Sequence, residues 1–128
     1  MYQPKQGDIV MLYFDPTAGH EQAGYRPALV VWGNDTLERI PGLAQVCAIS
    51  NTDNGFPLHV PLDADSTCTT GFVLCEQNKV LDLNARHVKF RDRVSEMVLQ
   101  EVLNILRAMI DLSKGGPAII MAGPHLLY

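Results

Sequence analysis

The amino-acid sequence predicts a small α+β domain in which one amphipathic helix lies against a curled antiparallel sheet. Short β-favouring segments separated by turn residues follow one another from residue 8 to residue 83, which is typical of antiparallel strands. A single long helical pattern then occupies residues 95–113. The 128 residues are enough for one domain with a core of its own.

The predicted strands are rich in apolar and β-branched residues and are bounded by Gly, Pro, Asn and Asp. They cover residues 8–14, 27–32, 44–50, 58–62, 71–75 and 79–83. In the fourth segment the apolar residues alternate and so share one face, and we expect His59 between them to point to the opposite face. Residues 51–55, between the third and fourth segments, are rich in turn formers.

The predicted helix runs from Ser95 to about Ser113, a stretch without Gly or Pro. Its apolar stripe repeats at spacings of four and three residues and consists of Val98, Val102, Ile105, Met109 and Leu112. Either Asp92 or Ser95 is suited to cap its start.

We expect residues 1–114 to form the domain. Residues 115–128 make an apolar tail that Gly and Pro interrupt, and its role stays open between packing on the domain, contact with a second chain and disorder. No apolar run reaches the roughly 20 residues of a membrane helix, and the N-terminus lacks the apolar core of a signal peptide. We therefore expect a cytoplasmic protein that does not contact membranes.

The cysteines Cys47, Cys68 and Cys75 are odd in number and form no Cys-x-x-Cys pair, so we expect neither a disulfide framework nor a zinc site. Cys47 and Cys75 lie in apolar runs and are expected to be buried. The net charge of −4 argues against binding nucleic acid over a broad basic surface. Five of the ten basic residues nevertheless fall within residues 79–93, either as a local basic cleft or as a solvated loop and helix entry.

The segment from Asp15 to Tyr25 is longer than most connections between strands and has no apolar face. Loops of this length are often functional. With the strand before and after it, over residues 7–10 and 14–31, the loop resembles the N-terminal signature of the MazF/PemK/Kid toxins. Residues 70–77 and 81–86 are similar to a second segment of that family, and the resemblance extends from about residue 7 to residue 110.

The resemblance implies a compact SH3-like barrel, shared with the gyrase poison CcdB, and a homodimer. It implies sequence-specific cleavage of single-stranded RNA and neutralisation by a cognate antitoxin of the MazE/PemI type. It also implies that operator DNA is bound only through the toxin–antitoxin complex, which then regulates its own operon. None of these properties follows from composition or periodicity.

Metal-free cleavage of RNA uses the adjacent 2′-hydroxyl as nucleophile and needs a base, an acid and positive charge beside the phosphoryl group. Arg26, at the end of the loop, has the planar fork that suits a phosphate, and the family's matching arginine is catalytic. Its alternative role is a structural ion pair, for example with Glu21. His20 is a candidate base or acid, or a loop residue that only contacts RNA. Glu21 is a candidate base, or it orients Arg26.

Ser50 matches a position where relatives carry a threonine that holds the scissile phosphate, and its alternative role is to cap its own backbone. Glu76 matches an acidic or amide position. Kid-like relatives carry Arg-x-Asp there, with both ends implicated in catalysis, whereas this chain has Leu74 and Glu76. The loss of one positive group implies a mechanism that relies more on Arg26 with His20, Glu21 or Ser50.

RNA contacts are expected from the loops around residues 15–25 and 51–56 and from residues of the second family segment. The candidates are Asn51, Thr52, Glu76, Gln77, Lys79 and Arg86. We expect Lys79, Arg86 and Lys89 to meet two copies of Arg26 across a dimer groove. His59, His87 and His125 lack partners at metal-ligand spacing, so neither a metal site nor a cofactor is expected.

Two alternatives share the same fold and so cannot be separated by it. One is a non-catalytic protein, either a CcdB-like topoisomerase inhibitor or an antitoxin co-repressor. The other is a toxin that has lost its activity through Leu74. The set formed by His20, Glu21 and Arg26 favours cleavage, because a protein that only binds has no obvious use for it.

Overall fold

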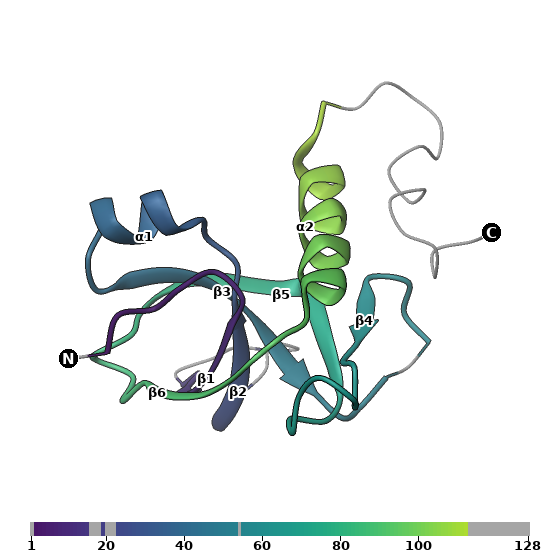
Figure 1. The fold of residues 1–128 in the computed structure, drawn as a ribbon, viewed down its shortest axis with the longest axis horizontal. Coiled ribbons are helices and arrows are strands. Elements are labelled where there is room, and N and C mark those ends of the chain that lie inside the picture. The colour runs from purple at the N-terminus through teal and green to yellow at the C-terminus, as the bar shows by residue number, and fades with distance from the viewer. Residues whose placement is uncertain (1, 16–18, 20–22, 54, 113–128) are drawn as a thin grey trace.

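The computed structural model confirms the α+β prediction, with a six-stranded antiparallel sheet that curls on itself and carries a long helix (Figure 1). The structure describes residues 2–15, 19, 23–53 and 55–112. The order of strands across the sheet is β4-β5-β3-β2-β1-β6. In chain order the elements are β1 (Asp8–Tyr13), β2 (Tyr25–Val30), α1 (Asn34–Arg39), β3 (Leu43–Ser50), β4 (His59–Pro61), β5 (Phe72–Asp82), β6 (Lys89–Arg93) and α2 (Glu96–Ile110).

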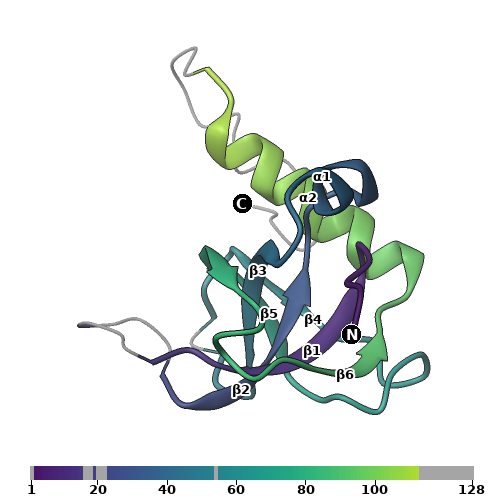
Figure 2. The same cartoon turned by 90° about the vertical axis from the view of Figure 1, so that its left-hand side faces the viewer.

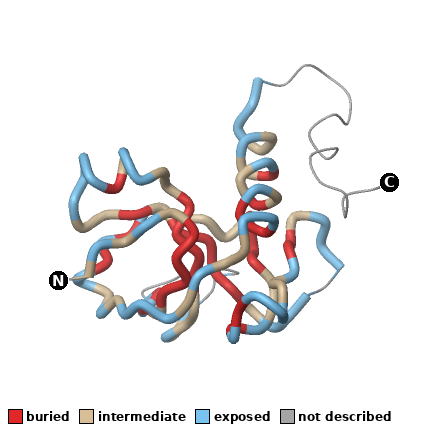
Figure 3. The backbone as a smooth tube through the Cα atoms, in the orientation of Figure 1, coloured by how far each residue is buried: buried red, intermediate tan, exposed pale blue. Residues whose placement is uncertain are grey.

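Both faces of the central strands are buried, which explains why their sequences read as nearly continuous apolar runs. Neighbouring residues therefore enter different core clusters, as Ile9 and Val10 do in β1 and Leu29 and Val30 do in β2. The first cluster includes the buried face of α2, and the second includes Leu37 of α1. Figure 3 shows buried backbone concentrated where these strands cross and on the inner side of α2.

The helix α2 begins and packs as its sequence pattern predicts but ends earlier. Ser95 is its N-cap and accepts a hydrogen bond from the Val98 amide at 3.2 Å, whereas Asp92 accepts from Cys68 instead. Val98, Val102 and Ile105 are buried. The expected end near Ser113 is wrong, because α2 stops at Ile110. Leu112, expected in the apolar stripe, is 85% exposed.

Two short elements, α1 and β6, were not expected from the sequence. The six residues of α1 bury only Leu37, so they carry no helical stripe. The β6 strand, Lys-Phe-Arg-Asp-Arg, pairs with β1 at the edge of the sheet, and its charged residues hide the strand pattern. Pro61 is the last residue of β4, the edge strand on the other side, where proline removes no ladder hydrogen bond.

The strands predicted at residues 71–75 and 79–83 are one strand, β5, which continues through Glu76, Gln77 and Asn78. Its pairing with β3 shifts register: Ile49 lies opposite Val73, but Cys47 lies opposite Asn78. Between these two pairs β5 advances five residues and β3 advances two, so β5 holds three extra residues. Such a bulge bends a strand, and the bend places Glu76 and Gln77 where the sheet curls.

None of the helices in the part of the chain that the structure describes is both long and apolar enough to cross a membrane. The tail predicted at residues 115–128 lies outside the described residues. Cys47 and Cys75 are buried as expected, and Cys68 is exposed. In the view of Figure 2, β2 rises from the bottom of the molecule toward its upper part, where both helices lie.

Candidate functional site

Arg26 lies near the loop end of β2, opposite Leu12 of β1. Its Nε donates to the Ala23 carbonyl at 2.6 Å, which holds the guanidinium beside the end of the loop. Further along the same face of β2, Ala28 and Val30 are completely buried. Because the strand is fixed by this burial, Arg26 projects from a rigid element, as the sequence predicts.

The base of the loop between β1 and β2 is closed by several hydrogen bonds. The Phe14 amide donates to the Gly24 carbonyl at 2.9 Å. Arg86 donates through Nη1 to the carbonyls of Tyr13 at 3.1 Å and Asp15 at 2.8 Å. Arg86, predicted to bind RNA, therefore also fixes the start of this loop.

The candidates His20 and Glu21 lie in the same loop but outside the described residues, so their roles stay predictions. The ion pair considered between Arg26 and Glu21 is outside them for the same reason.

Ser50 ends β3, the neighbour of β2. Ala28 lies opposite Ala48 in the β2–β3 pairing, and extending that register by two residues would set Arg26 opposite Ser50, on the same face as Ala28 and Ala48. The Ser50 hydroxyl accepts from the Thr52 amide at 3.1 Å. Ser50 therefore caps its own backbone, which is the alternative role considered for it. Its own proton remains available, because a hydroxyl both donates and accepts.

The turn after Ser50 is held against the chain that enters β5. Asn51 Oδ1 accepts from the Thr70 hydroxyl at 3.1 Å. Gly71 approaches so closely that a Cβ atom there would lie 2.6 Å from the Ser50 carbonyl oxygen. Asn51 and Thr52, both predicted to bind RNA, are exposed on this turn.

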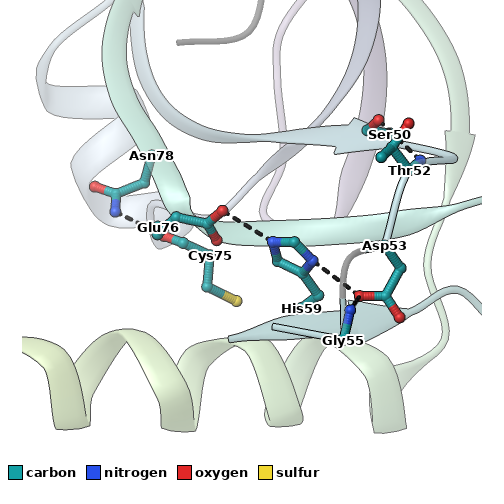
Figure 4. A network of polar contacts seen from close by, with 8 residues as sticks. All are labelled: Ser50, Thr52, Asp53, Gly55, His59, Cys75, Glu76 and Asn78. Carbon is teal, nitrogen blue, oxygen red and sulfur yellow. Dashed lines mark hydrogen bonds and ion pairs between the residues drawn. The ribbon is translucent and has the colours of Figure 1, made fainter. Parts of the chain in front are cut away.

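Glu76 and Gln77 follow in the bent part of β5. Glu76 Oε2 lies 2.9 Å from His59 Nε2, and the other ring nitrogen of His59 lies 3.1 Å from Asp53 Oδ1 (Figure 4). Glu76 Oε1 is buried and has no hydrogen-bond partner among the residues that the structure describes. The candidate residue Glu76 is thus tied through one imidazole to the loop after Ser50.

Sequence reasoning placed His59 correctly on the face opposite its apolar neighbours but missed both of its partners. Asp53 and Glu76 are six and 17 residues away, and only the pairing of β4 with β5 brings Glu76 close. No group of His, Cys, Asp and Glu within the described ranges could hold a metal ion. The arrangement around His59 is therefore a hydrogen-bonded network.

The basic residues of β5 and β6 make different contacts and lie in different parts of the sheet. Arg93 forms an ion pair with the buried Asp8, and Arg91 donates to the Thr69 hydroxyl at 3.0 Å. Lys79 lies in β5 and Lys89 in β6, two strands that β3, β2 and β1 separate in the sheet. A common basic groove for these two lysines stays a prediction about a dimer.

The buried thiols are unreactive by their surroundings. Burial, with the nearby Glu76 and Glu101 carboxylates, raises the pKa of Cys75 to about 12. Burial also raises the pKa of Cys47 well above 9.0. A thiol with such a pKa is protonated at neutral pH and is a poor nucleophile, so neither cysteine is suited to catalysis.

Comparison with known proteins identifies the family of this chain. A family model described as PemK-like, MazF-like toxin of type II toxin-antitoxin system matches residues 5–110. The chain belongs to this family. Its match to the PemK/MazF-like toxins covers all the strands and helices described above.

Individual toxins of the family are similar over most of their length. The endoribonuclease PemK of Escherichia coli is 36% identical, over 83% of this chain and 81% of its own. The endoribonuclease toxin MazF of Escherichia coli strain K12 is 30% identical, over 89% of this chain and 96% of its own. The crystal structure of MazF from Deinococcus radiodurans has a TM-score of 0.78 and 34% identity, and the match covers 86% of this chain and 98% of that one.

Proposed function

We propose that this PemK/MazF-like toxin is an endoribonuclease that cleaves single-stranded mRNA at specific sequences and needs no metal ion. The observation that carries the proposal is the register of β2 with β3, which pairs Ala28 with Ala48 and, extended by two residues, would set Arg26 opposite Ser50. Two strands of one rigid sheet thus offer a guanidinium and a hydroxyl to the same phosphate. The names of the relatives support the proposal, since PemK and MazF are both endoribonucleases.

In the proposed reaction the 2′-hydroxyl oxygen attacks the adjacent phosphorus, and the bond from phosphorus to the 5′-oxygen breaks. A base takes the proton of the 2′-hydroxyl, and an acid gives a proton to the departing 5′-oxygen. The products are a 2′,3′-cyclic phosphate and a 5′-hydroxyl. Because the nucleophile belongs to the substrate, no metal-bound water is required. DNA lacks the 2′-hydroxyl and is not cut.

Arg26 stabilises the charge that develops on the phosphoryl oxygens, or serves as the acid, and Ser50 donates to the same group. His20 and Glu21, in the loop whose base lies beside Arg26, provide the base or orient the arginine. Asn51, Thr52, Glu76 and Gln77 contact the bases, and Arg86 and Lys79 contact the backbone. Ser50 carries out by its hydroxyl what threonine does in relatives.

We also propose that the toxin acts as a cytoplasmic homodimer and is neutralised by a MazE/PemI-type antitoxin. A crystal structure of MazE–MazF from Deinococcus radiodurans supports the antitoxin partner. The match has a TM-score of 0.74 and 34% identity, and covers 88% of this chain and the whole of that one. The complex, and not the toxin alone, binds the operator.

The test incubates the purified protein with a long mixed-sequence RNA in the presence of EDTA and maps the cut sites and their end groups. Arg26→Ala is compared with Arg39→Ala, which removes an equal charge from the exposed last turn of α1. We expect discrete cuts with 5′-hydroxyl ends. Arg26→Ala should lower the rate by about 100-fold or more, and Arg39→Ala should leave it unchanged.

Intact RNA after incubation with folded wild-type protein would contradict the proposal and would favour the topoisomerase inhibitor or the co-repressor. Gyrase inhibition would then be measured. Cleavage that EDTA abolishes would contradict the metal-free mechanism. Equal losses in Arg26→Ala and Arg39→Ala would show that only overall charge is involved.

A further inference from the structure

The imidazole of His59 joins two carboxylates from separate parts of the fold. Its Nδ1 lies 3.1 Å from Asp53 Oδ1, in the loop after β3. Its Nε2 lies 2.9 Å from Glu76 Oε2, in the bend of β5. The His59 side chain is 6% exposed, whereas those of Asp53 and Glu76 are 30% and 27% exposed. The ring is thus the buried centre of a network whose outer members reach solvent.

The two contacts of His59 together require a proton on each side of the ring, supplied either by the imidazole or by a carboxyl group. An ionised carboxylate only accepts hydrogen bonds, and a neutral imidazole has a single N–H donor. Both contacts are therefore hydrogen bonds when the ring carries a proton on each nitrogen. A ring with one proton would need Asp53 or Glu76 to carry the other. The imidazolium form satisfies both carboxylates and offsets part of their charge.

The surroundings of His59 leave the ring little freedom. Its amide donates to the Phe56 carbonyl at 3.1 Å, which closes a turn through Pro57. The Phe56 ring packs against the imidazole at a centroid distance of 5.3 Å and an angle of 79°. The buried Leu74 lies directly opposite in the β4–β5 pairing. Charged hydrogen bonds are stronger in such a site than in water.

The loop between β3 and β4 depends on the Asp53 end of this network. Asp53 Oδ1 accepts from the Gly55 amide at 3.0 Å as well as facing His59. The same loop begins with Ser50, whose hydroxyl accepts from the Thr52 amide. Figure 4 shows Asp53, His59 and Glu76 joined by hydrogen bonds, with Ser50 and Thr52 on the turn that leads to Asp53.

We propose that His59 is a positioning residue for RNA recognition. It holds the turn that presents Asn51 and Thr52 and the bend that presents Glu76 and Gln77 in one fixed arrangement, so that both segments contact the same RNA. His59 acts through Asp53 and Glu76, because its own ring is buried while their side chains reach solvent. This inference rests on the proposed function of the chain as an endoribonuclease.

The test compares His59→Leu and His59→Gln with wild type and with Thr67→Val. Gln keeps one donor, Leu keeps none, and Thr67→Val breaks a buried hydrogen bond to the Thr69 carbonyl in the loop that precedes β5. Cut sites are mapped on random-sequence RNA, and kcat and KM are measured separately.

We expect His59→Leu to raise KM, to relax the base preference around the cut and to lower kcat/KM by about 100-fold, since small misplacements have effects of that size. His59→Gln should lie between Leu and wild type, and Thr67→Val should keep the wild-type preference. Retention of both rate and base preference in His59→Leu would overturn the proposal. So would losses in His59→Leu and Thr67→Val that follow only the folded fraction.

Nitrogen-15 NMR separates this inference from the proposed function. Failure of the wild type to cleave RNA refutes the nuclease, but the Gly55 amide still reports on positioning. We expect slow hydrogen exchange at Gly55 that becomes fast in His59→Leu. Unchanged exchange in that variant would overturn the positioning role whatever the activity.

Discussion

Gly71 lies against the end of β3 with no room for a side chain. A Cβ atom there would be 2.6 Å from the Ser50 carbonyl oxygen and 2.9 Å from its carbon. Real Cβ atoms do not approach backbone so closely, so one of the two segments would have to move. The φ angle of +113° adds a second obstacle, because it suits glycine and strains other residues.

The predicted cost of Gly71→Ala follows from these two effects. Backbone strain at such a φ contributes about 1 to 3 kcal/mol. Overpacking against a fixed backbone contributes about 1 to 3 kcal/mol more. We therefore expect a loss of about 2 to 6 kcal/mol in the free energy of unfolding. Because the nearest atoms belong to Ser50, the folded fraction should also cleave RNA more slowly.

Urea unfolding and RNA cleavage together check this prediction, with Gly42→Ala as the matched control. Gly42 has a φ of +90°, but a Cβ atom added there would have no neighbouring atom within 4 Å, so its substitution introduces strain alone. Gly71→Ala should be less stable than Gly42→Ala and should be impaired in cleavage per folded molecule. Equal stability losses in the two variants, with unchanged cleavage, would refute the reasoning about Ser50.

Three further predictions concern side chains away from the site. Burial raises the pKa of Cys47 and Cys75, so native protein should show one thiol reactive with Ellman's reagent, Cys68, and denatured protein should show all three; a second fast thiol would be inconsistent with that burial. Ser95→Ala removes the cap of α2 and should cost about 1 kcal/mol in a thermal or urea melt, whereas no measurable loss would show that the cap contributes nothing. Burial and, second, the hydrogen bond to Asp8 raise the pKa of the Tyr2 hydroxyl far above its usual 10.0. Near pH 10 only the unfolded chain releases this proton, so the free energy of unfolding should fall as pH rises above about 10. A Tyr2→Phe variant with an equally steep fall would count against this assignment.

The parts of the fold that the sequence predicts are those with a strong and simple pattern. The apolar stripe of α2 and the nearly continuous apolar runs of β1, β2 and β3 are of this kind. The helix α1 was missed because only Leu37 of its six residues is buried. The edge strand β6 was missed because charged residues dominate it, and β5 was divided because Glu76, Gln77 and Asn78 read as a polar loop.

In the candidate site the resemblance marks individual positions such as Arg26 and Ser50, whose roles stay predictions. The network around His59 could not be predicted, because its contact with Glu76 depends on the pairing of β4 with β5 and on a bulge of three residues. The register adds a detail that the sequence conceals. Leu74, which the resemblance aligns with the arginine of Kid-like relatives, lies opposite His59 in the β4–β5 pairing, so an imidazole from the neighbouring strand lies at the same level of the sheet.

The burial of both sheet faces limits where the sequence of such a protein can tolerate substitutions. A residue in the middle of β1, β2 or β3 contacts one core cluster or the other, so most substitutions there lower stability. The described residues of the segment after β3, 51–53 and 55–58, are exposed or half-buried and add little to the core. Target preference can therefore diverge in this segment while the scaffold stays constant, and exchanging residues 51–58 between two relatives should transfer sequence preference without unfolding the recipient.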